Sequence, residues 1–176
     1  MAVPMDSGLS LPSADFVRVG SSDDLAAANH RLRRFWDYAE SCRSDGGLPQ
    51  RRRFDPIDIP ALLPHIWIID ADVDTGRLSY RLVGTRVVAA IGFDPTGRDL
   101  AEIMAERIAR IPGLLDRYWF SARTGKATWR RGPARHWRNM EYAEVENLCV
   151  PFEDPRDRGI QMIGISVCYR ADGTEY

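Results

Sequence analysis

The side chains best suited to metal binding are few and widely separated. The histidines are His30, His65 and His136, and none has a second histidine or a cysteine at the spacing of a metal-ligand pair. We therefore interpret them as surface or half-buried residues and predict no metal site. A pH-sensing role for one of them stays open, because histidine titrates near physiological pH.

The cysteines offer one candidate for redox chemistry. Cys42, Cys149 and Cys168 cannot all pair with one another and form no C-x-x-C motif, which favours a reducing, cytoplasmic setting. Cys149 and Cys168 fall on the last two expected strands. They are either small buried hydrophobic residues or a redox-sensing pair, and the second alternative needs their Cα atoms within about 7 Å of each other.

Two arginine clusters could meet an anion. Arg51–Arg53 is followed by Asp55 and Asp58, so this run either binds an anionic ligand or pairs with its own acids. The second cluster interleaves arginines with tryptophans, which can stack on nucleotides, but glutamates on the next expected strand can neutralise it. Its members are Arg130, Arg131, Arg135, Arg138, Trp129 and Trp137, followed by Glu141, Glu144 and Glu146. We therefore regard nucleic acid as an unfavoured partner.

A single arginine is the best candidate for a polar group inside the protein. Arg81 and Arg86 flank a Gly84-Thr85 turn, and Arg81 alternates with Tyr80 and Leu82 along an expected strand, so that one of these two sets points inward. An inward Arg81 would need a carboxylate partner or a ligand anion, because an unpaired buried charge is costly.

The chain as a whole is close to neutral. Its 176 residues include 24 basic and 25 acidic ones, and this balance argues against a broad electrostatic surface for nucleic acid. No apolar run approaches the roughly 18–20 residues that span a bilayer, and residues 1–15 lack the features of a secretory signal peptide. We therefore expect a cytoplasmic protein with no membrane partner.

The first element that must position these residues is an amphipathic helix over residues 22–45. Ser21 or Ser22 can cap it and Gly46-Gly47 ends it. We divide the chain into a flexible lead-in (1–21), this helix as a capping or dimerisation element (22–47) and one domain (48–176). The apolar stripe of the helix recurs at three- and four-residue spacing and consists of Leu25, Ala28, Leu32, Phe35, Trp36 and Ala39.

The remaining pattern predicts two strands, several short helices and three further strands. The strands lie at 66–69 and 78–83, joined as a hairpin, then at 127–137 with a bend at Gly132-Pro133, at 141–152 and at 160–170. The helices lie within 87–91, ended by Gly92, within 100–111, and within 112–122, ended by Gly125; the expected buried stripe of the last helix is Leu114, Leu115, Tyr118, Trp119 and Ala122. Five antiparallel strands with grouped helices make an α+β fold with the short helices on one face. Because residues 66–69 are apolar on both faces, the helix at 22–45 should cover the other face, in its own chain or in a partner.

Several of these segments resemble the PAS domain superfamily. Arg81-Leu82-Val83-Gly84-Thr85 leads into a short helix, and Gly92-Phe93 and Gly97-Arg98-Asp99-Leu100 fill the places of its Gly-aromatic turn and its Gly-Arg step. The chain is similar, over roughly residues 30–170, to a family of short PAS-like proteins common in alphaproteobacteria. That similarity rests on Phe54-Asp55-Pro56, Asp58-Ile59-Pro60, Leu62-Leu63-Pro64, Ile66-Trp67 and the Arg-Leu-Val-Gly-Thr segment. It implies a PAS-like sheet and a sensing or docking module without its own catalytic output.

The resemblance also implies a central cavity between the sheet and the helices. Haem sensors of the superfamily place a histidine on the mid-chain helices and its flavin photosensors place a cysteine there; residues 66–135 contain neither. We therefore expect no haem or covalent flavin, and the identity of any ligand is unknown. The candidate cavity residues are Arg81, Val83, Val87, Ile91, Trp119 and Cys149, and the candidate dimerisation residues are Leu25, Leu32, Phe35 and Trp36.

The leading interpretation is a signalling module that senses a small molecule or docks a regulatory protein, works as a homodimer and acts through another protein. Two alternatives stay open. One is a small enzyme on a curved α+β barrel, which would need a buried acid–base pair at its cavity, although no hydrolase, zinc-protease, P-loop or Rossmann motif is present. The other is a purely structural adaptor whose core is filled by side chains.

Overall fold

One antiparallel sheet organises the chain. The computed structural model describes residues 16–44, 46–106, 113–134, 142–154 and 159–176. The strand order in the sheet is β1-β4-β5-β6-β2-β3, and each neighbouring pair is antiparallel. The strands are β1 (Val17–Val19), β2 (Ile66–Asp72), β3 (Arg77–Val83), β4 (Ala127–Pro133), β5 (Glu144–Asp154) and β6 (Gly159–Tyr169), and the helices are α1 (His30–Ser41), α2 (Thr85–Ile91), α3 (Leu100–Glu106) and α4 (Leu114–Thr124).

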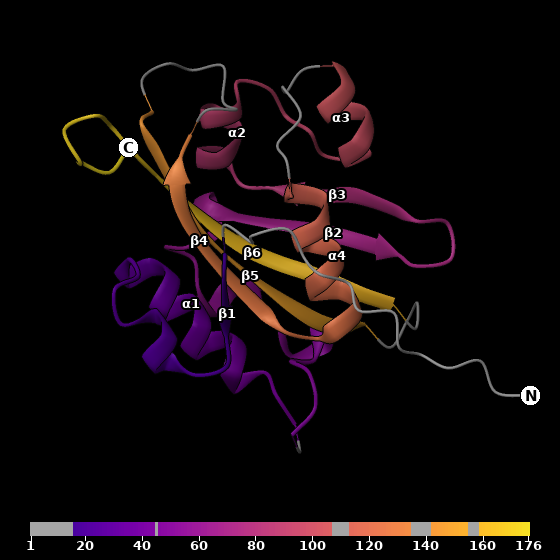
Figure 1. The fold of residues 1–176 in the computed structure, drawn as a ribbon. Coiled ribbons are helices and arrows are strands. Elements are labelled where there is room, and N and C mark those ends of the chain that lie inside the picture. Colours follow the sequence, from indigo (N-terminus) through magenta and orange to yellow (C-terminus); the bar gives the residue numbers. More distant parts are fainter. Residues whose placement is uncertain (1–15, 45, 107–112, 135–141, 155–158) are drawn as a thin grey trace, which may run out of the picture.

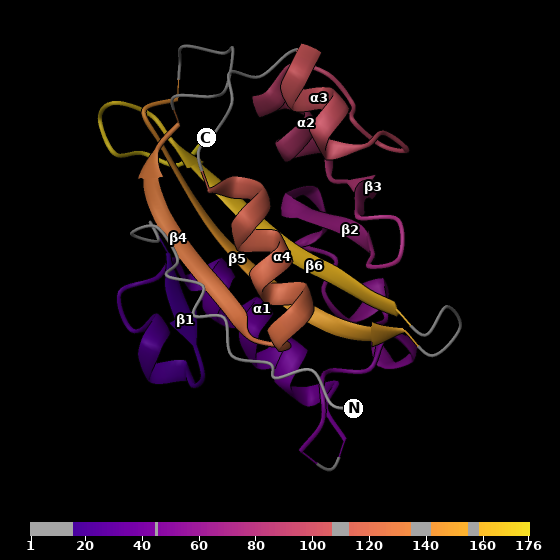
Figure 2. The same cartoon turned by 45° about the vertical axis from the view of Figure 1, so that its right-hand side comes forward.

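Helices cover the sheet from both sides. In Figure 2, α4 runs across one face of the long β5–β6 hairpin, while α1 lies behind the same strands. Helices α2 and α3 both lie above the β2–β3 hairpin in the view of Figure 1. We call the face under α2 and α4 the inner face and the face under α1 the outer face. The predicted α+β class, with short helices on one face and the N-terminal helix on the other, is therefore confirmed.

Strand β2 shows why both faces need a cover. Successive side chains of a strand point to opposite faces, and here both sets are apolar. Ile66 and Ile68 pack in the outer cluster with α1, whereas Trp67 and Ile69 pack in the inner cluster with α4, and all four are buried. This confirms the prediction that the segment is shielded on both sides.

The sheet has six strands where five were predicted. The additional strand, Val17–Val19, lies in the segment expected to be a flexible lead-in and pairs with Ala127–Trp129 at the start of β4. Without this addition β4 would be an open edge, and a paired backbone there satisfies hydrogen-bonding groups that an edge leaves free. The remaining residues of the expected lead-in, 1–15, lie outside the described residues.

The N-terminal helix is shorter than predicted. The expected helix over 22–45 is replaced by a 3-10 turn at Ser22–Leu25 and by α1, which begins only at His30. The break comes from Asn29, whose side chain accepts a hydrogen bond from the backbone N–H of Arg31 (2.8 Å) and so caps a new helix. Short polar side chains compete with the helix for backbone groups in this way.

The four candidate dimerisation residues belong to the core of one chain. Leu25, Leu32 and Phe35 are 0% exposed and Trp36 is 3% exposed, packed in the outer cluster against the chain's own sheet. Their assignment to a dimer surface is therefore corrected, because the same apolar stripe cannot line both the core and an interface. A homodimer stays a prediction that needs another surface.

The mid-chain elements follow the predicted order. Glycines in the left-handed region end α2 and α4, with φ of 83° at Gly92 and 67° at Gly125, where any side chain would strain the backbone. Both were predicted as helix ends. The helix expected over 100–111 is α3 for its first part, and residues 107–111 lie outside the described residues, as do 135–137 of the bent strand.

Candidate functional site

An aromatic side chain lies across the centre of the inner face. Trp67 of β2 passes over Gly164 of β6, donates from Nε1 to Ser166 Oγ (2.9 Å) and meets the Tyr118 ring of α4 edge to face at 5.4 Å. A Cβ at position 164 would come within 2.1 Å of the indole, so glycine is needed for this close approach. Trp67 and Tyr118 therefore form an aromatic floor between sheet and helix.

A fully buried arginine stands beside this floor. Arg117 of α4 is 1% exposed. Its Nε donates to Thr128 Oγ1 (2.9 Å) and its Nη2 donates to the Thr128 carbonyl (2.7 Å). From the next strand, the Asn147 side-chain oxygen accepts from Nη1 and the Asn147 carbonyl accepts from Nη2 at 3.4 Å. The guanidinium thus ties α4 to β4 and β5 through neutral oxygens alone.

Helical spacing places this arginine on the inner face. One side of α4 carries two pairs of residues at four-residue spacing, Arg117 with Ser121 and Tyr118 with Ala122. All four are buried against the sheet, and Ser121 Oγ lies 3.2 Å from Thr128 Oγ1. The polar atoms of the site therefore converge from one helix and two strands.

The other titratable groups nearby are held in their neutral forms. Burial raises the pKa of the Cys149 thiol to about 11, although the Arg117 cation opposes this shift. Burial also raises the pKa of the Tyr118 phenol well above its usual range, with a smaller contribution from Tyr80. Because a charge without water is unfavourable, neither group offers an anion to the guanidinium at neutral pH.

Most of the predicted cavity residues lie in this region. The structure places Val83, Val87 and Cys149 in the inner cluster, and it places Ile91 and Trp119, both partly buried, against that cluster. That they contact a ligand stays a prediction.

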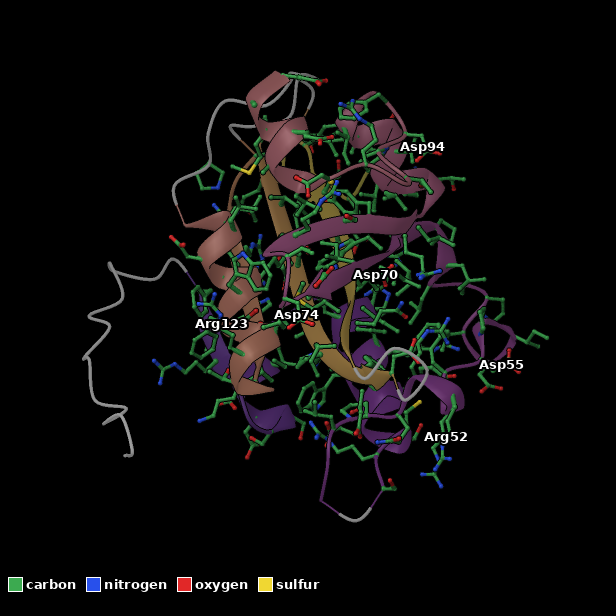
Figure 3. All side chains as sticks on the ribbon, turned by 90° about the vertical axis from the view of Figure 1, so that its right-hand side faces the viewer. Arg52, Asp55, Asp70, Asp74, Asp94 and Arg123 are labelled. Atoms are coloured by element: carbon green, nitrogen blue, oxygen red, sulfur yellow. The ribbon has the colours of Figure 1, made fainter. Side chains whose placement is uncertain are left out.

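Arg81 does not belong to the inner face, contrary to the prediction. A β-bulge between Ile68 and Ile69 pairs these residues with Leu82 and Tyr80 and leaves Arg81 as the additional residue. Its side chain is exposed and its Nε donates to Asp70 Oδ2 at 2.8 Å. Figure 3 shows Asp70 on β2, where it also accepts a hydrogen bond from Gln161 (2.6 Å).

The redox pair of cysteines is also excluded. Cys149 pairs in register with Gly164, whereas Cys168 pairs with Val145, which lies four residues from Cys149 along β5. At about 3.3 Å per residue this offset separates the two cysteines by roughly 13 Å, about twice the span of a disulfide. All three cysteines are free and buried, which agrees with the alternative of small hydrophobic residues.

The arginine clusters are used within the fold. Arg51 Nε donates to Gln161 Oε1 (2.6 Å) and its guanidinium lies 5.2 Å from the Phe54 ring, so it does not pair with the neighbouring acids. In Figure 3, Arg52 and Asp55 extend away from the body of the fold. In the second cluster, Arg131 pairs with Glu144 (2.9 Å), as expected for a neutralised edge. The members Arg135, His136, Trp137, Arg138 and Glu141 lie outside the described residues.

A second buried polar group lies on the outer face. Glu146 is 0% exposed, and its Oε1 accepts from the Asn29 backbone N–H and from Trp129 Nε1, both at 2.9 Å. Its Oε2 accepts from the Tyr169 hydroxyl at 2.6 Å. This carboxylate joins the start of α1 to strands β4, β5 and β6.

The side chains and helices of the described part of the chain also bear on metal binding and membrane crossing. Among these residues, no group of three or more histidine, cysteine, aspartate or glutamate side chains could hold a metal ion. His65 is buried, its Nδ1 lies 3.1 Å from the Ser166 carbonyl, and burial lowers its pKa. No described helix has the length and apolar character needed to cross a bilayer.

The fold and the comparisons with known proteins agree. A five-strand core in the order β4-β5-β6-β2-β3, with α2, α3 and α4 inserted between β3 and β4 along the chain, fits the PAS-like α+β fold that the sequence predicted. A family model described as "PAS domain" matches residues 26–167, and the chain belongs to this family. It is thus a sensory or signalling module in general terms.

A solved structure described as "Structure of an RNA-binding Light-Oxygen-Voltage Receptor" is similar, with a TM-score of 0.42 and 19% sequence identity, over 82% of this chain and 46% of that chain. This chain therefore spans less than half the length of that protein. No curated protein matches.

Arg117, the charged residue of the site, was not predicted from the sequence to be a site residue. The apolar stripe predicted for α4 included Leu115 and Trp119, and this placed Arg117 on the solvated side. The structure rotates the buried stripe toward Arg117 and Ser121. A stripe centred on Leu114, Tyr118 and Ala122 includes both polar residues, but the spacing alone does not select it over the stripe through Leu115 and Trp119.

Proposed function

We propose that this protein is a PAS sensory module that binds a small molecule between α4 and the sheet and acts through a partner protein, without a catalytic step. The observation that carries the proposal is the buried polar group of Arg117, Ser121, Thr128 and Asn147 in an otherwise apolar layer. Small-molecule sites have this composition, with apolar walls and a few placed polar groups.

The chemistry of the layer favours binding over catalysis. A general acid–base reaction needs a group that titrates near the working pH, and burial moves the pKa of Cys149 and Tyr118 away from it. The buried carboxylate Glu146 lies on the outer face and is already hydrogen-bonded to three donors. Among the described residues, none of the inner polar group is a carboxylate or a histidine.

Strand β5 offers a route from ligand to partner. Asn147 faces Arg117 on the inner face, and its neighbour Glu146 holds the start of α1 on the outer face. Because adjacent residues of a strand point to opposite faces, a shift of Asn147 moves the group that anchors α1. We propose that a regulatory protein recognises the outer face, and that the protein works in the cytoplasm, in keeping with its free cysteines.

Native mass spectrometry of the protein purified from cells tests the sensing role. We expect a stoichiometric additional mass, which disappears in Ala122→Leu because that side chain fills the buried layer beside Arg117. The matched control is Ala101→Leu, at an exposed position of α3, which should keep the mass. Circular dichroism serves to check that both variants fold.

Absence of any additional mass from the wild-type protein would contradict ligand sensing and leave the docking role. An additional mass that survives in Ala122→Leu would place the ligand elsewhere.

A further inference from the structure

The charge of Arg117 has no counter-ion among the described residues. A guanidinium stays protonated in proteins, and taking a charge out of water is costly unless an opposite charge meets it. Its four hydrogen-bond contacts come from the side chains and carbonyls of Thr128 and Asn147, which are all neutral. The ion pairs of the described residues do not include Arg117.

The surroundings add to the positive potential. Arg117 is the fourth residue of α4, close to the positive end of the helix dipole. Arg130 lies near enough to disfavour the Arg117 charge further, and no ion pair of the described residues includes Arg130. Cys149 and Tyr118, which could supply an anion, stay neutral. The site is thus built for a negative charge that the described chain does not supply.

We propose, on the basis of the proposed function, that the ligand is a small organic monoanion: a carboxylic acid with an apolar or aromatic body. Its carboxylate binds the Arg117 guanidinium, and its body lies along the Trp67–Tyr118 floor.

The donor count sets the charge of this ligand. A guanidinium has five N–H groups, and the four contacts leave one of them on Nη1. A carboxylate takes this donor and displaces the neutral Asn147 side-chain oxygen, because in a site without water a guanidinium attracts an opposite charge more strongly than a neutral oxygen.

The aromatic floor sets the body of the ligand. The ring pair of Trp67 and Tyr118 is surrounded by the apolar inner cluster, with Val87 from α2 and Ala122 from α4. Aromatic rings pack favourably against such pairs in offset or edge-to-face geometry. A polar body, such as that of a sugar acid, would leave its hydroxyls without partners.

Fluorine NMR with two matched probes tests the proposal. The probes are 4-fluorobenzoate and its neutral amide, 4-fluorobenzamide, titrated to millimolar concentration against the full chain. We expect the acid to bind about ten- to a hundred-fold more tightly than the amide, the range for a hydrogen bond to a charged group. Arg117→Gln removes this preference, and Arg117→Lys keeps it with weaker binding.

The matched control variant is Arg123→Gln. Arg123 lies on the same helix at an exposed position, as Figure 3 shows, and stacks on Trp119, so its loss should leave the preference for the acid unchanged. Circular dichroism verifies the fold of each variant.

Three results would overturn the proposal. They are equal binding of acid and amide, no binding of the acid at millimolar concentration, and an acid preference that persists in Arg117→Gln. The wild-type comparison alone decides the question if a variant does not fold. A neutral molecule found by native mass spectrometry would refute the anion while leaving the sensing role intact, whereas no bound molecule and no probe binding would refute both.

Discussion

Replacing Gly164 by alanine tests the packing on which the inner face depends. The new Cβ would lie 2.1 Å from Trp67 Cζ2 and 2.4 Å from two further indole carbons, so the indole must move. Gly164 is not among the glycines with positive φ, and the substitution therefore acts through this contact and not through backbone strain.

The cost has two parts. Overpacking a core costs about 1–3 kcal/mol, and displacing the indole also breaks its hydrogen bond to Ser166 Oγ, which leaves buried groups unsatisfied at about 1–3 kcal/mol. We expect Gly164→Ala to lower the free energy of unfolding by about 3 kcal/mol, a large share of the stability of a small domain. Urea denaturation followed by far-UV circular dichroism measures this change.

Two controls define the result. Gly47→Ala should be nearly neutral, because its Cβ would meet its nearest neighbour at an ordinary 3.5 Å. In a Trp67→Leu background, Gly164→Ala should cost less than about 1 kcal/mol, because the clashing ring is gone. A small loss in the wild-type background, or an equal loss in both backgrounds, would refute the argument that the indole occupies this position.

Four further predictions follow from where the structure places these side chains. Leu32→Asp should lower the free energy of unfolding by several kcal/mol, and with it the melting temperature, because this side chain lies in the chain's own core. The molar mass measured by light scattering should not change. Mild peroxide should produce no Cys149–Cys168 link in an intact-mass spectrum. Burial raises the pKa of Cys149 from 9.0 to about 11, so the contribution of the neutral thiol to the free energy of unfolding should be fully present below about pH 9 and should fall as the pH rises toward about 11, as measured by denaturation curves. Arg81→Ala should change the free energy of unfolding by less than about 1 kcal/mol in urea denaturation, because the ion pair of Arg81 with Asp70 is exposed. It should also leave the binding of 4-fluorobenzoate unchanged.

Most of the architecture could be predicted from local pattern. The run Ile66 to Ile69 indicated a strand buried on both faces, and glycines at 92 and 125 marked helix ends that the structure confirms. These signals are local, because alternation and left-handed glycines depend only on a few neighbouring residues. The turn and Gly-Arg segments that resemble PAS proteins are local in the same sense.

Apart from the local helix break at Asn29, the errors share one cause, since each required knowledge of which distant segment packs against the residue. The strand at Val17–Val19 forms because β4 is there to pair with it, and the dimer surface expected around Phe35 is core because its own sheet is there to cover it. Periodicity shows that a stripe will be buried, but it does not show against what.

The sequence by itself determined the class of fold, the glycine ends of α2 and α4 and the apolar character of both sheet faces, because these follow from the types and spacing of nearby residues. Only the tertiary structure decided which arginine is inside. A bulge turns Arg81 out to Asp70, and the rotation of α4 turns Arg117 in toward Thr128 and Asn147. Both choices depend on strand register and helix rotation, which are set by packing between segments far apart in the chain.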